Sequence, residues 1–222
     1  MIARIRKVGL ATALVVAVAL SACGQNGSRG PGESSTIAVK LIAVNDFHGQ
    51  LTPPGGGTRV PDPESGGRTV LLPTGGAAYL ATVVQQLKAR NNLHVVVAAG
   101  DLIGASPLES ALFHDEPSIE ALNEIGLEYS AVGNHEFDDG VGELRRMQAG
   151  GCRGGKAEET CRRGPFRGAS FQYLAANVVD RQTGKHLFPA SAIKTLDVGR
   201  GKPLMIGFIG AVLEDVPDIV VA

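Results

Sequence analysis

Short apolar runs followed by polar residues predict the strands of a β-sheet. Strands are expected at Thr36–Val44, Leu93–Ala99 and Tyr129–Val132, because short, largely apolar runs that end in polar loops are typical of buried strands. Two later runs, Phe171–Val178 and Pro203–Ile209, have the same character. The sequence therefore predicts a domain built around a sheet.

Apolar residues recur at helical spacing between these runs. Ala77–Arg90 has this spacing, and Val141–Gln148 is also expected to be helical. A shorter helix is predicted at Ser118–Ile125, with Pro117 in its first turn and Gly126 as its stop. The alternation of strands and helices predicts an α/β fold with a sheet that is at least partly parallel.

Three segments lack a clear periodic pattern. Thr52–Gly76 is rich in Pro and Gly, so we expect a long surface loop without helix or sheet, close to the functional edge of the sheet. A polar turn is expected at Asp180–His186, and Asp218–Val221 near the end of the chain has strand-like character.

The first residues predict export from the cytoplasm. Arg4, Arg6 and Lys7 give a basic start, and the apolar stretch Val8–Leu20 is too short for a comfortable membrane span. The Leu-Ser-Ala-Cys string that ends at Cys23 resembles the bacterial lipobox, in which the cysteine is lipidated. The alternative is an ordinary signal peptide with a cysteine near its cleavage point.

Three regions follow from this pattern. Residues 1–23 are expected to be a lipoprotein signal peptide ending in the lipobox cysteine, and residues 24–35 a flexible linker, since they are small or polar. Residues 36–222 would form the folded part. We expect a lipid anchor in the membrane through Cys23 and a location in the cell envelope, on the periplasmic or extracellular face.

The two remaining cysteines, Cys152 and Cys161, enclose a polar, glycine-rich loop. An exported protein can form disulfides, and a short soft loop gains order from one, so a disulfide is predicted. The alternative is a zinc knuckle, which needs two more ligands at close spacing. No third cysteine lies nearby, and the nearest imidazole, His135, belongs to another motif.

Composition argues against some classes of function. The net charge is −1, so there is no electrostatic case for binding a nucleic-acid polymer. Tryptophan is absent and aromatic residues make up 5% of the chain, which weakens a reading as a surface that stacks sugars or bases.

Chemically active residues follow the three predicted strands directly, in Asn45–Gly49, Gly100–Asp101 and Gly133–Asp138. In an α/β sheet the carboxyl ends of neighbouring strands meet at one edge, where ligands bind. These segments would bring carboxylates, two imidazoles and a carboxamide together. Ligands of this mix suit two hard or borderline divalent cations.

Local spacing supports this reading. Asp46 and His48 are two residues apart, which in extended backbone places both side chains on one face and Phe47 on the other, toward the core. Asp101 follows Gly100, where a glycine allows the sharp turn that would aim the carboxylate across the edge of the sheet.

The three motifs occur in the order Asp-x-His, Gly-Asp and Gly-Asn-His-Glu, which resembles the calcineurin-like metallophosphoesterases. The fuller strings NDFHG and GNHEFD, with Leu174–Val178 and Ile206–Gly210, resemble the 5'-nucleotidase branch. That branch includes UDP-sugar hydrolases and cyclic-nucleotide phosphodiesterases. The likeness runs from about Ile37 to the end of the chain.

The resemblance implies a fold and a metal centre. The fold would be the family's sandwich of mixed sheets flanked by helices. Asp46 and His48 would hold one ion, Asp101 would bridge two, and Asn134 would hold the second. Two such ions lie about 3.5–4 Å apart. Their identity is open among Mn, Zn, Co, Mg and Ca.

The resemblance also implies catalytic roles. His135 would face the substrate, a nucleotide or other phosphoester, and Asp138 would orient its imidazole and keep it protonated. Glu136 is left out of the site, because family sites do not use its carboxylate to bind metal. His94, His114 and His186 have no partner motif and are expected to be structural or surface residues.

The sequence departs from the family in its later part. The family draws further histidines from two later segments, but no histidine follows His186. The expectation is therefore an N-terminal portion of a longer enzyme, without the C-terminal nucleotide-binding domain and with poor activity by itself. The alternative is a truncated, non-catalytic envelope lipoprotein that binds metal or phosphate weakly.

Overall fold

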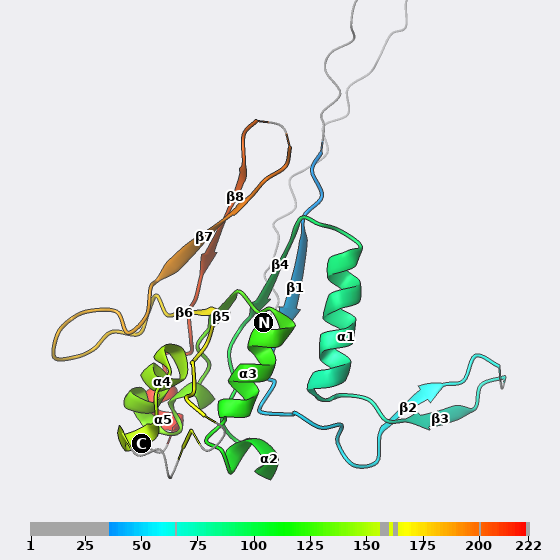
Figure 1. The fold of residues 1–222 in the computed structure, drawn as a ribbon, viewed down its shortest axis with the longest axis horizontal. Coiled ribbons are helices and arrows are strands. Elements are labelled where there is room, and N and C mark those ends of the chain that lie inside the picture. Colours follow the sequence, from blue (N-terminus) through cyan, green and yellow to red (C-terminus); the bar gives the residue numbers. More distant parts are fainter. Residues whose placement is uncertain (1–35, 65, 156–159, 162–163, 200, 221–222) are drawn as a thin grey trace, which may run out of the picture. The chain divides into compact units, whose positions relative to one another are not determined.

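Four parallel strands form the central sheet of the computed structural model, which describes residues 36–64, 66–155, 160–161, 164–199 and 201–220. The strands are β1 (Lys40–Val44), β4 (His94–Ala98), β5 (Tyr129–Ala131) and β6 (Gln172–Leu174), adjacent in that order (Figure 1). All three pairings are parallel. The predicted parallel sheet is confirmed, and the three motif-bearing loops leave the same ends of β1, β4 and β5.

The predicted helices are also confirmed. They are α1 (Gly76–Ala89), α3 (Glu116–Ile125) and α4 (Gly140–Ala149). The backbone of Gly126 is left-handed at the end of α3, and its N–H binds the carbonyls of Leu122 and Asn123, as expected of a glycine stop. A short helix, α2 (Leu108–Ala111), precedes α3, and 3-10 turns cover His135–Phe137 and Arg153–Gly155.

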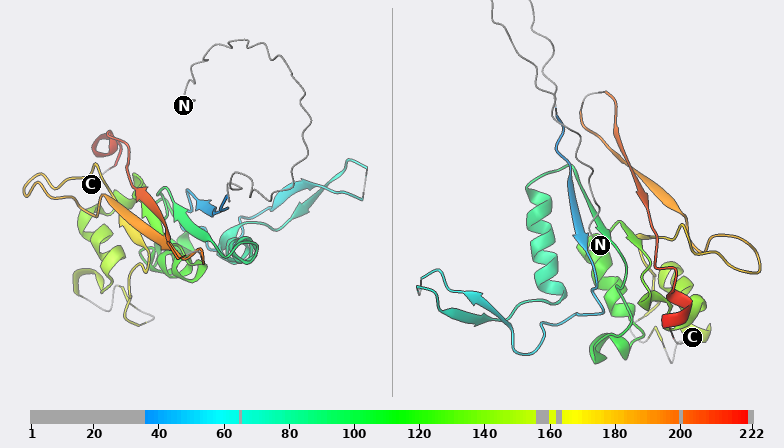
Figure 2. Two further views of the ribbon diagram at one scale, coloured as in Figure 1. Left: turned by 90° about the horizontal axis from the view of Figure 1, so that it is seen from above. Right: turned by 180° about the vertical axis from the view of Figure 1, so that it is seen from behind.

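Helices α1 and α3 lie side by side against the sheet (Figure 2). Val84 of α1 and Ile119 and Leu122 of α3 are almost fully buried, together with Val96 of β4. Lys88, near the end of α1, donates to the carbonyl of Ile125 at 2.8 Å and so links the two helix ends. This packing joins α1 and α3 to the sheet that carries the three motifs.

The prediction of a structureless loop at Thr52–Gly76 is wrong. Strands β2 (Thr58–Pro61) and β3 (Thr69–Leu72) form an antiparallel hairpin there, which projects away from the helices in Figure 1. Pro61 is tolerated because it is the last residue of a strand in a two-stranded ribbon, where a missing N–H costs little. Gly66 and Gly67 lie between the two strands, and the other glycines of the segment lie before β2 or after β3.

The C-terminal part differs from prediction in two places. A strand not predicted from the sequence, β7 (Ser191–Leu196), pairs antiparallel with β8 (Leu204–Ile209). Its residues alternate between exposed and partly buried, so it lacks a continuous apolar run. Asp218 and Ile219, expected to be strand-like, lie instead in the short helix α5 (Val216–Ile219), which Pro217 in its first turn favours.

The predicted signal peptide, Cys23 and the linker lie outside the described residues. Residues Ile37–Ala222 form one compact unit. In the described part of the chain, no helix is long and apolar enough to cross a membrane.

Candidate metal centre

Backbone hydrogen bonds bring the loops that follow β1 and β4 side by side. The N–H of Asp46 donates to Gly100, that of His48 to Asp101, and that of Gly49 to Leu102, at 3.0 to 3.3 Å. The two loops therefore stay hydrogen-bonded to each other for a few residues beyond the ends of β1 and β4. This pairing fixes the first two motifs relative to each other.

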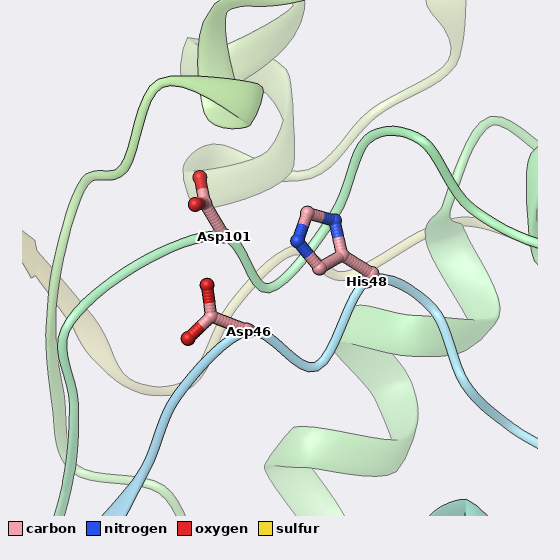
Figure 3. A group of neighbouring side chains, drawn as sticks. All are labelled: Asp46, His48 and Asp101. Carbon is pink, nitrogen blue, oxygen red and sulfur yellow. The ribbon is translucent and has the colours of Figure 1, made fainter.

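One ligand atom from each of Asp46, His48 and Asp101 lies within 4.8 Å of the others. Their side chains point into a common space (Figure 3). Two carboxylates and one imidazole are donors that divalent cations accept, so the residues present fit a metal ion. Phe47, between the first two, is 6% exposed and packs in the core, as expected.

The extended backbone expected at Asp46 and His48 is not observed, because these two residues and Asp101 have left-handed backbone in the paired loops. The φ angles are 52° at Asp46, 44° at His48 and 50° at Asp101. Such conformations cost non-glycine residues free energy of the order of 1–3 kcal/mol each, and they concentrate at functional sites. The surrounding hydrogen bonds must therefore hold these loops in place.

The ring of His48 is oriented by a backbone carbonyl. Its Nδ1 lies 2.9 Å from the carbonyl oxygen of Gly104. Since a carbonyl only accepts, Nδ1 must carry the proton, which leaves the lone pair of Nε2 free for a metal. The site thus selects the tautomer that a ligand needs.

The third motif joins the site through Asp101. The N–H of His135 donates to Oδ1 of Asp101 at 3.0 Å, and the rings of His48 and His135 meet edge to face with 4.9 Å between centroids. Asn134, the remaining candidate ligand, is half-buried just before the 3-10 turn. Residues from all three motifs therefore meet around one point.

His135 and Asp138 form an ion pair, with 2.8 Å between Nδ1 and Oδ2. The hydrogen bond to Asp138 raises the pKa of His135, although partial burial opposes the shift. The imidazolium is therefore favoured next to the candidate ligands. The cation can stabilise negative charge on a neighbouring oxyanion.

Glu136, which sequence reasoning left out of the site, holds the second and third motifs together. Its side chain is buried, and its carboxylate accepts the N–H groups of Asp101 at 2.9 Å, Leu102 at 2.8 Å and Gly133 at 2.5 Å. Burial raises the pKa of Glu136 to about 7, despite these three hydrogen bonds. The Gly-Asn-His-Glu string marks Glu136 as part of a motif, but it does not indicate that the carboxylate accepts backbone N–H groups.

A second group of donors, His114, Asp139 and Glu143, also lies within ligand distance. The guanidinium of Arg153 already contacts it, at 2.7 Å from Nδ1 of His114, 3.4 Å from Asp139 and 3.8 Å from Glu143. An internal cation therefore balances these carboxylates, and His114 has a structural partner.

Arg153 follows a disulfide directly. Cys152 and Cys161 are joined with an S–S distance of 2.26 Å, so neither thiolate is free to bind zinc. The N–H of Cys161 donates to Glu116, which also pairs with Arg146. The disulfide loop is thereby tied to α3 and α4.

A family model described as calcineurin-like phosphoesterase matches residues 39–183 of the chain. This range contains all three motifs and the candidate ligands. The resemblance drawn from the order of the motifs is therefore confirmed.

Two curated relatives illustrate the range of similarity. An uncharacterized protein in the pqq-V 5' region of Acinetobacter calcoaceticus is 44% identical over 188 residues, which cover 84% of this chain and 92% of that protein. A probable 5'-nucleotidase of Treponema pallidum is 33% identical over 136 residues, or 61% of this chain and 21% of that one. The chain spans less than a third of other, longer relatives as well.

The fold has counterparts among solved structures. The NAD nucleotidase NadN of Haemophilus influenzae matches with a TM-score of 0.59 and 22% identity, over 81% of this chain and 27% of that one. At this identity the match speaks for the fold, which is the α/β phosphoesterase fold predicted from the motifs.

Proposed function

Because the chain belongs to the calcineurin-like phosphoesterase family, we propose that it takes part in metal-dependent hydrolysis of phosphoesters, with nucleotides as the substrate class. The observation that carries the proposal is the meeting of Asp46, His48 and Asp101 beside the His135–Asp138 pair. Ligands for a cation and a separate proton-bearing imidazole then face the same space.

Each residue has a distinct role in this proposal. Asp46 and His48 would hold one divalent ion, Asp101 would bridge to a second, and Asn134 would hold that second ion. Bound ions of this kind lower the pKa of water toward about 7 and neutralise phosphoryl oxygens. His135, kept protonated by Asp138, would donate to the phosphoryl group or the leaving oxygen.

The nucleotide assignment and the location are further parts of the proposal. Nucleotides are supported by the NDFHG and GNHEFD strings and by the relative named as a probable 5'-nucleotidase. We propose a lipid-anchored envelope protein on the strength of the basic and apolar start and Cys23.

A second candidate is a lipoprotein that binds one metal ion or phosphate weakly and does not turn over. The number of donors favours it: one imidazole and two carboxylates form the cluster in the described residues, and the sequence has no histidine after His186. A dinuclear centre needs more ligands than these three.

The two candidates differ in metal content and turnover. The full chain would be loaded with Mn²⁺ or Zn²⁺, its metal content measured by mass spectrometry, and phosphate release followed with AMP, UDP-glucose and 2',3'-cyclic AMP. We expect slow release that EDTA abolishes and that is lost in His135→Ala but kept in His186→Ala, a change at an exposed histidine. One bound ion without release from any substrate would favour the weak binder.

Replacing Asp138 by asparagine is expected to lower the pKa of His135, because the hydrogen bond to Asp138 is the main cause of its rise. A raised pKa extends the imidazolium to higher pH, and the stability from this pair is lost as pH rises through that pKa. In Asp138→Asn, both the titration and the falling limb of any activity should move to lower pH.

This shift can be measured by NMR titration of the His135 ring in the metal-free chain. Asp197→Ala, at an exposed aspartate of the turn after β7, is the matched control and should leave the His135 titration in place. An unchanged titration in Asp138→Asn would show that the pair does not set the pKa.

A further inference from the structure

We propose that Asp115 is a positioning residue of the metal centre: it holds the backbone of Gly104 so that the Gly104 carbonyl fixes the tautomer of His48. The inference rests on the proposed role of His48 as a metal ligand. Asp115 does not reach the ligand cluster itself. It acts through one loop, Leu102–Ser106, which follows the Gly-Asp motif.

The side chain of Asp115 does not cap the helix that it precedes. Asp115 stands at the N-cap position of α3 but makes no side-chain hydrogen bond to that helix, although aspartate commonly caps in this way. Its φ is 58°, and the preceding His114 has a φ of 51°. Two successive left-handed residues that are not glycine are costly, so the turn is held by other contacts.

Those contacts engage both carboxylate oxygens of Asp115. Oδ2 accepts the N–H of Gly104 at 3.1 Å, and Oδ1 accepts the hydroxyl of Ser110 at 2.6 Å. Ser110 is fully buried, and its oxygen lies 2.5 Å from the hydroxyl of the equally buried Ser118. Because Ser110 donates to Asp115, Ser118 must donate to Ser110. Ser118 thus donates to Ser110 and Ser110 donates to Asp115, and these two hydrogen bonds fix the position of the Asp115 carboxylate.

Gly104 lies between this carboxylate and the site. Its carbonyl accepts from Nδ1 of His48 at 2.9 Å. On its other side, an added Cβ would lie 2.6 Å from Oδ2 of Asp138 and 2.7 Å from the carbonyl oxygen of His135. Gly104 therefore has little room to move, and Asp115 anchors the N–H of the same residue whose carbonyl orients His48.

The consequence concerns the proton on His48. A neutral imidazole carries its proton on either Nδ1 or Nε2, and the hydrogen bond of the other nitrogen decides which. When the Gly104 carbonyl is in place, Nδ1 is protonated and Nε2 can bind a cation. Without it, the Nε2-protonated form competes, and that form offers no lone pair at the nitrogen facing the cluster.

The test uses Asp115→Gly in the full chain. Glycine adopts a φ of 58° readily, so the variant removes the carboxylate and keeps the turn. Long-range ¹H–¹⁵N spectra of the metal-free protein, taken above the pH at which histidine ionises, report the tautomer of His48. We expect Nδ1 protonation in the wild type, a mixture in Asp115→Gly, and about tenfold weaker Mn²⁺ binding by calorimetry.

Two further variants make the result specific. Asp115→Asn keeps an acceptor for Gly104, and asparagine tolerates left-handed backbone, so it should restore the wild-type tautomer. Asp197→Ala, an exposed aspartate far along the chain, should change neither readout. If Asp115→Gly failed to fold, Ser110→Ala would release Oδ1 of Asp115 and should give part of the same tautomer shift.

A folded Asp115→Gly whose His48 tautomer and Mn²⁺ affinity match the wild type would overturn the proposal. The tautomer is read without metal or substrate. A wild-type chain that binds Mn²⁺ but hydrolyses no phosphoester would therefore count against the proposed function and leave the role of Asp115 intact.

Discussion

Replacing Glu136 by alanine is expected to lower the free energy of unfolding by about 3–5 kcal/mol, because three N–H groups lose their acceptor in a buried site. The donors belong to Asp101, Leu102 and Gly133. Each buried, unsatisfied donor costs about 1–3 kcal/mol, and water entering the space left by the side chain offsets part of that. Denaturant unfolding of the metal-free chain measures the change.

The same substitution should weaken metal binding, since Asp101 would lose the bond that orients its backbone. Glu124→Ala is the matched control, because Glu124 lies exposed on α3 and surface changes usually stay within about 0.5 kcal/mol. If Glu136→Ala and Glu124→Ala had the same free energy of unfolding, the carboxylate of Glu136 would not be what joins the loops that follow β4 and β5.

The role of Glu136 shows what the sequence could and could not reveal. Strand ends and ligand spacing are local: Asp46 and His48 are two residues apart, and the stop at Gly126 follows its helix directly. Such features can be predicted from short windows. Glu136 binds N–H groups 34 and 35 residues away along the chain, and no local pattern encodes that pairing.

The hairpin of β2 and β3 was missed for a related reason. Its strands pair across a turn, with Val60 opposite Val70, while the Pro and Gly content of the segment suggested only a loop. Residue type likewise gave no warning that His48 would have a φ of 44°, since most histidines avoid this region. These features arise from tertiary contacts that override local preference.

The order of the motifs was nevertheless enough to predict the family and the cluster of Asp46, His48 and Asp101. Neighbouring parallel strands bring their carboxyl ends to one edge, so the topology alone places the three motifs together. What topology cannot supply is the atomic fit between the loops. That fit depends on Glu136, on Asp115 and on the absence of a side chain at Gly133.

Replacing Gly133 by alanine is expected to weaken Mn²⁺ binding by about 100-fold. A Cβ at this position would lie 2.2 Å from Oδ1 of Asp101 and 2.5 Å from its backbone nitrogen. No real Cβ approaches other atoms so closely, so Asp101 would have to move. That movement would displace a candidate ligand from Asp46 and His48 and break its hydrogen bond from His135.

Calorimetric titration of the full chain with Mn²⁺ measures this effect. Denaturant unfolding should show that overpacking in Gly133→Ala lowers the free energy of unfolding by about 1–3 kcal/mol. Gly142→Ala is the matched control, because Gly142 lies in α4 and a Cβ there meets no atom within 4 Å. It should stabilise the helix by about 0.5–1 kcal/mol and leave Mn²⁺ affinity unchanged. Equal Mn²⁺ affinity in Gly133→Ala and wild type would mean that Asp101 does not bind the ion, and the proposed bridging role would fail with it.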